Sequence, residues 1–195
     1  MGKIYQKGAN KKLPTGTTVT IAVLAAISVI LYYLEFPLPF FPPFLKFDFS
    51  DLPAIIAALL FSPLVGLLIA LLKNLIHLLN TSTGGVGELA NFIVSAAFVL
   101  AAGFYKFKKT KKRAILSLLL GTITMTIIAC IANYYILIPF YEKFMNIEAI
   151  ISMCGAKSLW EAILIAFVPF NLLKGLVLSI ITYLLYKRIS HLIRR

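Results

Sequence analysis

Long apolar runs, separated by short polar or proline-rich segments, make up most of the chain. The clearest runs cover residues 16–36, 88–107, 112–138 and 159–188, and a further apolar stretch extends from residue 50 to residue 80. Runs of about 20 apolar residues are long enough to cross a bilayer as α-helices. The alternating pattern of a transmembrane β-barrel is not visible. The pattern therefore predicts an all-α integral membrane protein, with one transmembrane domain over residues 1–195.

Basic residues gather in three clusters that hold fourteen of the nineteen lysines and arginines and none of the seven acidic residues. Such clusters mark the cytoplasmic side of membrane proteins. We therefore expect the basic N-terminus (residues 1–15), the loop after residue 107 and the C-terminus to be cytoplasmic. The clusters are Lys3, Lys7, Lys11 and Lys12; Lys106, Lys108, Lys109, Lys111, Lys112 and Arg113; and Lys187, Arg188, Arg194 and Arg195.

The apolar stretch of residues 50–80 is either one span or a hairpin broken at Ser62-Pro63. Because an even number of spans must separate clusters that share one side, the stretch has to count as two. We predict a short second helix over residues 50–62 and a third helix over residues 63–80. A helix of about 13 residues is roughly 20 Å long, so the second helix must lie among its neighbours. The result is a bundle of six transmembrane helices.

A segment rich in proline and phenylalanine, residues 37–49, follows the first span on the external side. The surrounding stretch 35–53 holds five of the nine prolines and six of the fifteen phenylalanines. Proline lacks a backbone donor and fixes φ, so this segment is not a spanning helix. It is also too apolar for a solvated linker, and we expect an ordered lid or pocket wall.

Residues 139–158 form a second external segment with room for a short helix. All acidic residues are expected outside or at outer helix ends; they are Glu35, Asp48, Asp51, Glu88, Glu142, Glu148 and Glu161.

The composition excludes several classes of function. Hydrophobic residues make up 61% of the chain and charged residues only 13%, whereas soluble domains carry about 25% charged residues. The net charge of +12 lies mainly in the cytoplasmic clusters, so we expect a lipid bilayer and no nucleic acid as a partner. The cysteines and histidines lack metal-ligand spacing, and no catalytic constellation or nucleotide motif is visible. We predict no metal, no catalytic residue and no required cofactor.

Amide and ionisable side chains occur within the predicted spans, where they are costly and usually face the bundle interior. Asn91, Asn133, Asn171 and Lys174 fall in the outer or middle parts of their spans, beneath the proline-rich segment. Asparagine can both donate and accept hydrogen bonds, and aromatic rings can stack on a flat ligand. These residues indicate an outward-facing pocket for a mostly neutral heteroaromatic compound. Alternatively, each amide only links helices.

Lys73, in the third predicted helix, has two alternatives: it either pairs with an acidic residue or extends its ammonium group to the membrane interface.

Five motifs, in order along nearly the whole chain, resemble those of the substrate-binding S components of energy-coupling factor (ECF) vitamin transporters, and most closely the riboflavin-specific members. The motifs are EFPLPFFPPFLKFDFSDLPA (35–54), FSPLVGLLIALLKNL (61–75), ELANF (88–92), ANYYILIPFY (132–141) and PFNLLKG (169–175). The resemblance implies a six-helix fold and high-affinity capture of riboflavin beneath the first external loop, between helices 4, 5 and 6. It also implies a complex with a transmembrane coupling protein and two ATP-binding-cassette (ABC) ATPases.

The same resemblance assigns individual residues. Asn133 and Lys174 match positions that bond the isoalloxazine ring, and Leu45 to Asp48 match the segment that closes over the ligand. Ala22 and Ala26 match the small-residue motif by which helix 1 docks on the coupling protein, and their spacing lets another helix approach closely. The ligand-binding candidates are Asn133, Lys174, Asn91, Asn171, Leu45, Lys46, Phe47, Asp48 and Tyr134.

The sequence therefore predicts a non-enzymatic S component in the cell membrane of a prokaryote. It would capture riboflavin from outside and deliver it through partners that hydrolyse ATP. An S component for another vitamin, a small membrane enzyme acting on lipid and a scaffold subunit without a ligand are the alternatives.

Overall fold

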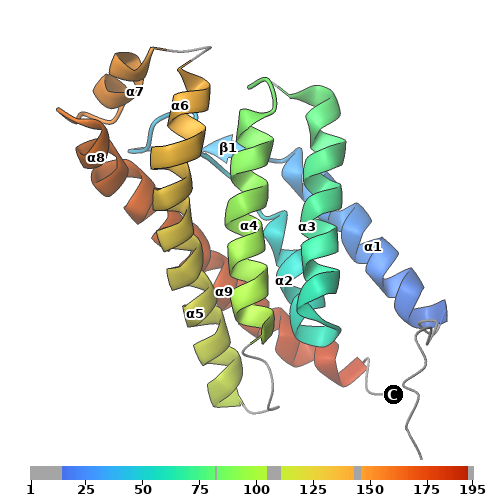
Figure 1. Ribbon diagram of the computed structural model, residues 1–195. Helices are drawn as coiled ribbons and strands as arrows, with labels where there is room; N and C mark the ends of the chain where they lie inside the picture. The colour runs from blue at the N-terminus through green and yellow to red at the C-terminus, as the bar shows by residue number, and fades with distance from the viewer. Residues whose placement is uncertain (1–14, 82, 105–110, 143–145, 193–195) are drawn as a thin grey trace, which may run out of the picture.

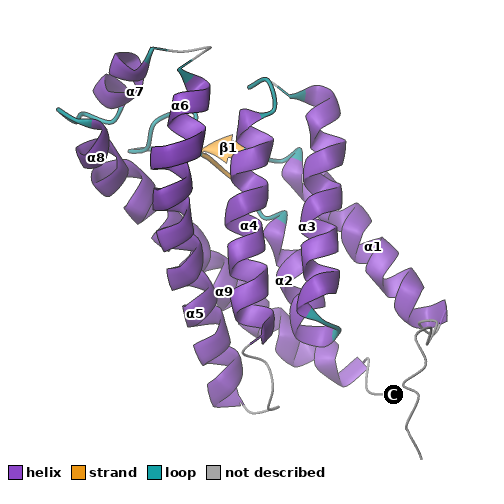
Figure 2. Cartoon of the chain, in the orientation of Figure 1, coloured by secondary structure: helices purple, strands orange, loops and turns teal. Residues whose placement is uncertain are grey.

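The computed structural model describes residues 15–81, 83–104, 111–142 and 146–192, which form a helical bundle with one pair of two-residue strands (Figures 1 and 2). The helices are α1 (Thr15–Tyr32), α2 (Asp51–Leu60), α3 (Pro63–His77), α4 (Val86–Phe104), α5 (Lys111–Ala132), α6 (Ile138–Tyr141), α7 (Ile147–Met153), α8 (Leu159–Ala162) and α9 (Val168–Leu192). A 3₁₀ turn, η1 (Leu78–Asn80), extends α3.

Two spans are longer than these labels suggest, because π-helical turns join neighbouring helices. The turn η2 (Asn133–Leu137) continues α5 into α6, and η3 (Ile163–Phe167) joins α8 to α9. Together with the shorter apolar helix α2, the spans confirm the prediction of an all-α membrane fold with six helices. The stretches long and apolar enough to cross a membrane are Thr15–Tyr32, Pro63–Asn80, Val86–Phe104, Lys112–Phe140 and Leu159–Leu185.

The short helix α2 is the centre of the bundle. Nine of its ten residues are buried, and at 1.5 Å per residue it is only about 15 Å long. The helix α3 begins two residues later, where the Ser62 hydroxyl accepts a hydrogen bond from the Val65 backbone N–H at 3.3 Å and Pro63 occupies the first turn. A serine cap followed by proline is a strong helix start. The predicted break at Ser62-Pro63 is therefore where the chain reverses.

A glycine lets three helices approach each other closely at this point. A Cβ added to Gly66 of α3 would lie 2.6 Å from the Ala54 carbonyl oxygen of α2 and 2.6 Å from a Val99 methyl group of α4. Such distances are far below ordinary van der Waals contact. The absence of a side chain at Gly66 is thus what allows α2, α3 and α4 to pack together.

The proline-rich loop folds back as a small hairpin. Strand β1 (Phe36–Pro37) pairs antiparallel with β2 (Lys46–Phe47), and the Lys46 ammonium pairs with the Glu35 carboxylate beside them. Between the strands, Phe40 adopts a positive φ of 74° and its side chain is fully exposed. The loop is ordered and non-helical, and it lies toward one end of the bundle (Figure 1).

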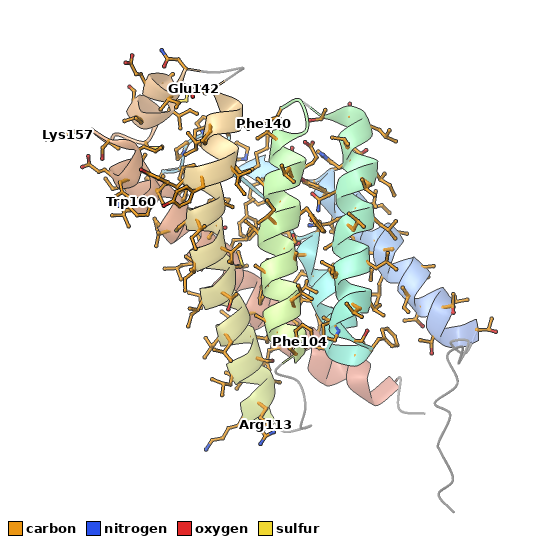
Figure 3. The ribbon with its side chains drawn as sticks, in the orientation of Figure 1. Phe104, Arg113, Phe140, Glu142, Lys157 and Trp160 are labelled. Carbon is orange, nitrogen blue, oxygen red and sulfur yellow. The ribbon has the colours of Figure 1, made fainter. Side chains whose placement is uncertain are left out.

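The two ends of the bundle carry different residues. Figure 3 shows Phe104 and Arg113 at one end, and Phe140, Glu142, Lys157 and Trp160 at the other. We call these the Arg113 end and the Glu142 end; the hairpin lies nearer the Glu142 end. Which end of the bundle faces the cytoplasm stays a prediction, because the basic residues within 3–12, 106–109 and 194–195 lie outside the described residues.

Helix α1 lies at the edge of the bundle (Figure 1). Only Ser28 and Tyr32 on it are buried, while Ala22 and Ala26 are both exposed. This leaves a long apolar face of α1 without a partner within the described chain.

Candidate ligand-binding site

A cavity lies between the proline-rich loop, helix α4, the segment η2–α6 that continues α5, helix α7 and the segment η3–α9. Its volume of about 120 Å³ is room for on the order of ten water molecules. Most of the lining is apolar, with a few polar side chains among it, which is typical of a small-molecule site. The lining residues are Phe44, Leu45, Lys46, Gly87, Ala90, Asn91, Val94, Asn133, Ile138, Ile150, Phe167, Phe170, Asn171 and Lys174.

Six of the nine ligand-binding candidates line this cavity: Asn91, Asn133, Asn171, Lys174, Leu45 and Lys46. The other three do not. Phe47 and Asp48 are buried behind the loop, with 3% and 1% of their surface exposed. Tyr134 packs instead against Trp160, with ring centroids 4.9 Å apart.

The cavity has aromatic walls that the sequence reasoning missed. Phe167 and Phe170 precede Lys174 by seven and four residues, so the three side chains share one helix face. On the loop side, Phe44 packs against Phe167 with ring centroids 6.0 Å apart, and Phe41 packs edge-on against Phe170 at 5.4 Å. These contacts close the loop against α9. The helical spacing to Lys174 is the signal that would have identified both phenylalanines.

Two lining amides are held by their own helices. Asn133 Nδ2 donates to the Ala129 carbonyl at 2.7 Å, and Asn171 Nδ2 donates to the Phe167 carbonyl at 2.8 Å. Each amide therefore uses a donor within its helix and keeps its Oδ1 as an acceptor for the cavity. A ligand polar edge with N–H groups would satisfy these oxygens.

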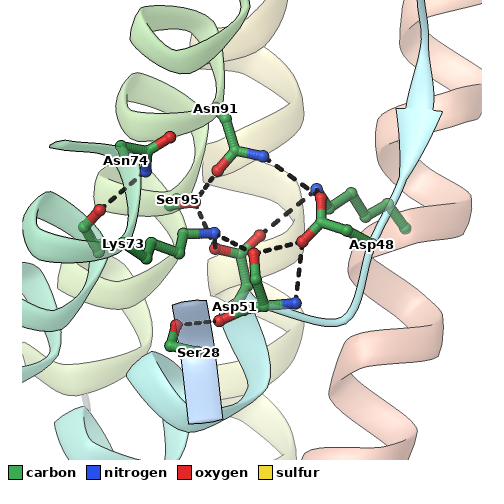
Figure 4. Close-up of polar contacts among 10 residues, drawn as sticks. Ser28, Asp48, Asp51, Lys73, Asn74, Asn91 and Ser95 are labelled. Atoms are coloured by element: carbon green, nitrogen blue, oxygen red, sulfur yellow. Dashed lines mark hydrogen bonds and ion pairs between the residues drawn. The ribbon is translucent and has the colours of Figure 1, made fainter. Parts of the chain in front are cut away.

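Behind the cavity, two carboxylates and two lysines form a buried network (Figure 4). Lys174 Nζ lies 2.8 Å from Asp48 Oδ2 and 3.5 Å from Asp51 Oδ2, while Lys73 Nζ lies 2.7 Å from Asp51 Oδ1. None of the four residues is more than 4% exposed. Burial alone raises the pKa of the Asp48 carboxyl, but the ammonium groups of Lys174 and Lys73 outweigh burial and hold that pKa well below its usual range.

Hydroxyl and amide groups complete the network. Asp48 Oδ1 accepts hydrogen bonds from the Ser50 backbone N–H at 2.8 Å and from the Ser50 hydroxyl, and Asp48 Oδ2 accepts one from Asn91 at 3.3 Å. The Ser95 hydroxyl donates to Asp51 Oδ1. Both carboxylates are thus satisfied within the protein, as buried charges must be.

This network bears on two expectations. Asp48 and Asp51 lie in the loop and at the start of α2, and both are buried. Of the two alternatives for Lys73, the structure shows pairing with an acidic residue, because its Nζ lies 2.7 Å from Asp51 Oδ1; the Nζ also lies 5.1 Å from the centroid of the Tyr32 ring. The missing information was the partner of each charge, which lies on another helix.

Comparison with known proteins gives the family. Residues 16–186 match the family model described as "ECF transporter, substrate-specific component". The chain belongs to this family. It is a multi-pass membrane protein, and we refer to it below as an S component.

Individual relatives match over nearly the full length. The riboflavin transporter RibU of Staphylococcus aureus (strain TCH60) is 40% identical over 187 residues, which cover 95% of this chain and 94% of that protein. The riboflavin transporter FmnP of Bacillus subtilis (strain 168) is 36% identical over 176 residues, with 88% and 90% covered. A solved structure of the S component of a bacterial ECF transporter is 38% identical, has a TM-score of 0.76, and is matched over 92% of this chain and 98% of that chain.

The S component has a second buried polar cluster beside the first. His77 Nδ1 lies 2.9 Å from Glu88 Oε1, and the Thr81 hydroxyl donates to Glu88 Oε2 at 2.9 Å. The His77 ring stacks on Tyr32, with centroids 3.8 Å apart. The cluster ties α1, α3 and α4 together beneath the glycine-rich turn, where Gly85 has a positive φ of 91°. None of these residues lines the cavity, so we assign the cluster to holding the helices.

Proposed function

We propose that this S component captures riboflavin from outside the cell and delivers it through a complex with a coupling protein and ABC ATPases. The observation that carries the proposal is the cavity beneath the loop, which Asn133, Asn171 and Lys174 line together. Phe44, Phe167 and Phe170 supply apolar walls for a flat ring. A tricyclic ring with an edge of alternating carbonyl and N–H groups fits this set.

The names of the relatives support the ligand class. Two proteins that are 40% and 36% identical over most of their length are named riboflavin transporters.

The delivery step needs partners, and α1 has the surface for one. Its exposed Ala22 and Ala26 lie one turn apart, and small residues at this spacing let another helix pack closely in a membrane. We assign this face to the coupling protein, with ATP hydrolysis by the ATPases of the complex. The S component itself then contributes binding and no catalysis, and riboflavin is its substrate and not a cofactor.

The orientation belongs to the same proposal. We place the Arg113 end in the cytoplasm of a prokaryotic cell, with both termini, and the Glu142 end with the hairpin outside. The six spans are then residues 16–36, 50–62, 63–80, 88–107, 112–138 and 159–188, with external segments at 37–49 and 139–158. The cavity opens on the outer side in this orientation.

Purification tests the ligand directly. Protein isolated from riboflavin-containing medium is expected to be yellow and to show flavin absorption, with riboflavin identified after release. Colourless protein that binds no added riboflavin would contradict the proposal, and release of a different vitamin would favour an S component of other specificity. Turnover of lipid by the pure protein would favour an enzyme instead.

Substitutions in the cavity test the residues. We expect Asn133→Ala and Lys174→Ala to weaken riboflavin binding by about 1–3 kcal/mol each, because a buried hydrogen-bonding group of the ligand loses its partner. Fluorescence quenching of riboflavin measures the dissociation constant. The matched control is Asn74→Ala: Asn74 also donates to a carbonyl of its own helix, Ala70 at 2.8 Å, but it does not line the cavity. Equal losses in Asn74→Ala and Asn133→Ala would remove Asn133 from the site.

A further inference from the structure

The buried network behind the cavity has no net charge. Its two ammonium groups, Lys73 and Lys174, are balanced by the carboxylates of Asp48 and Asp51 through contacts of 2.7 to 3.5 Å. Of the two carboxylates, Lys73 pairs only with that of Asp51, whereas Lys174 pairs with both. Asp51 is therefore largely committed to Lys73, and Asp48 is the carboxylate that compensates Lys174.

Of the four residues of this network, Lys174 is among the lining residues of the cavity, and Asp48, Asp51 and Lys73 are not. The other lysine among the described lining residues, Lys46, is likewise paired with a carboxylate that does not line the cavity, that of Glu35. Each cationic group that a ligand can touch is thus compensated from behind.

The network leaves one type of bond for a ligand. An ammonium group has three N–H donors. That of Lys174 donates a hydrogen bond to Asp48 Oδ2 at 2.8 Å and forms an ion pair with Asp51 Oδ2 at 3.5 Å. A remaining donor suits an acceptor of a ligand. An anionic acceptor at that position would lose its hydration on entering the cavity, and a network without net charge repays little of that cost.

We propose that Asp48 is a specificity-determining residue: by compensating Lys174, it makes the cavity prefer an uncharged hydrogen-bond acceptor to an anionic one. The inference deepens the proposed function and rests on it, because in that proposal the uncharged acceptor is a carbonyl edge of the riboflavin ring. Asp48 acts through Lys174 and does not touch the ligand, so it is a positioning residue.

The riboflavin ring supplies its own probe. Its imide N–H loses a proton in alkaline solution, the negative charge then spreads over the neighbouring carbonyl oxygens, and the visible absorption spectrum changes. Spectra of the bound flavin against pH, recorded at flavin concentrations that saturate each protein, give the acid dissociation constant of the bound imide. This constant reports how the cavity ranks the neutral ring against its anion, independently of overall affinity.

The sign of the effect follows from the charge of the network. Asp48→Asn leaves it at +1, and we expect the acid dissociation constant of bound riboflavin to rise by about ten- to a hundredfold. Lys174→Gln leaves it at −1, and the constant is expected to fall. The double variant Asp48→Asn/Lys174→Gln is neutral again, and its constant should return toward that of the wild type even though binding stays weak. A purely structural role of Asp48 would not give opposite shifts that cancel.

Glu88→Gln is the matched control. It also removes a buried carboxylate, but Glu88 bonds His77 and Thr81 and has no contact with Lys174. The acid dissociation constant of the bound imide should be unchanged in this variant. An acid dissociation constant that is the same in Asp48→Asn and in the wild type, or that rises equally in Glu88→Gln, would overturn the inference.

The remaining outcomes are also decisive. If Asp48→Asn does not fold, Lys174→Gln and the double variant carry the test, and an unchanged constant in Lys174→Gln would overturn the inference. Wild-type protein that binds no riboflavin overturns the proposed function and the inference with it. Wild-type binding without the shifts overturns the inference alone.

Discussion

Removing one partner of the buried pair Lys73–Asp51 should cost far more stability than removing one partner of the partly exposed pair Lys46–Glu35 in the hairpin. At 2.7 Å the Coulomb attraction is about 6 kcal/mol with an effective dielectric constant of about 20, and most of it offsets the cost of taking two charges out of water. The pair therefore contributes little compared with two apolar side chains. Removing one partner is different, because the other charge stays buried.

Asp51→Asn tests this most severely. The Lys73 ammonium, which is fully buried, would lose its charged partner and keep neutral ones: the Ser50 hydroxyl, the face of the Tyr32 ring and the amide oxygen that replaces a carboxylate oxygen. We expect a loss of about 3–5 kcal/mol in the free energy of unfolding. Lys73→Met should cost less, about 2 kcal/mol, because Asp51 retains Ser95 and, at 3.5 Å, Lys174.

Unfolding by SDS titration from mild-detergent micelles, followed by circular dichroism, measures these differences. The control is Lys46→Met, because the side chains of Lys46 and Glu35 are 37% and 20% exposed and such pairs contribute about 0–1 kcal/mol. The expected order of destabilisation is Asp51→Asn, then Lys73→Met, then Lys46→Met. An Asp51→Asn protein within about 1 kcal/mol of the wild type, as for an exposed pair, would refute the reasoning.

Three further predictions concern packing, topology and partner docking. Gly66→Ala should lower the free energy of unfolding by about 1–3 kcal/mol because the new methyl group overlaps α2 and α4, whereas Gly16→Ala, which meets nothing within 4 Å, should not destabilise. In a background without native cysteines, Lys109→Cys, at a position outside the described residues, should stay protected from an impermeant thiol reagent in intact cells; labelling there would contradict the six-span orientation. Ala22→Leu combined with Ala26→Leu should block riboflavin uptake by cells while the purified protein binds riboflavin with unchanged affinity, and normal uptake would exclude this face as the docking surface.

Hydropathy was enough to predict the bundle, because each span is a local property of 15 to 30 residues. The basic clusters then resolved residues 50–80 into two helices, which no local feature except Ser62-Pro63 suggests. The π-helical turns at Asn133–Leu137 and Ile163–Phe167 were not predicted, although a proline, Pro139 or Pro169, follows each of them two residues later and removes a helical backbone donor.

Only the polar part of the cavity was predicted. Asn91, Asn133, Asn171 and Lys174 stand out because polar side chains are costly within a span, and all four line the cavity. The phenylalanines of the wall do not stand out among so many apolar residues. The ion pairs could not be read from the sequence, because Asp51 and Lys73 are 22 residues apart and Asp48 and Lys174 are 126 apart.

The shortness of α2 also bears on how the chain is inserted during synthesis. A helix of about 15 Å reaches through only half of a hydrocarbon layer of roughly 30 Å, so it does not insert as an independent element. The helix α3 follows after only two residues, Phe61 and Ser62, and brings Lys73 to Asp51. We therefore expect α2 and α3 to enter the bilayer as one hairpin, because the pairing of its two charges avoids two separate insertion costs of about 2.5–3.5 kcal/mol each.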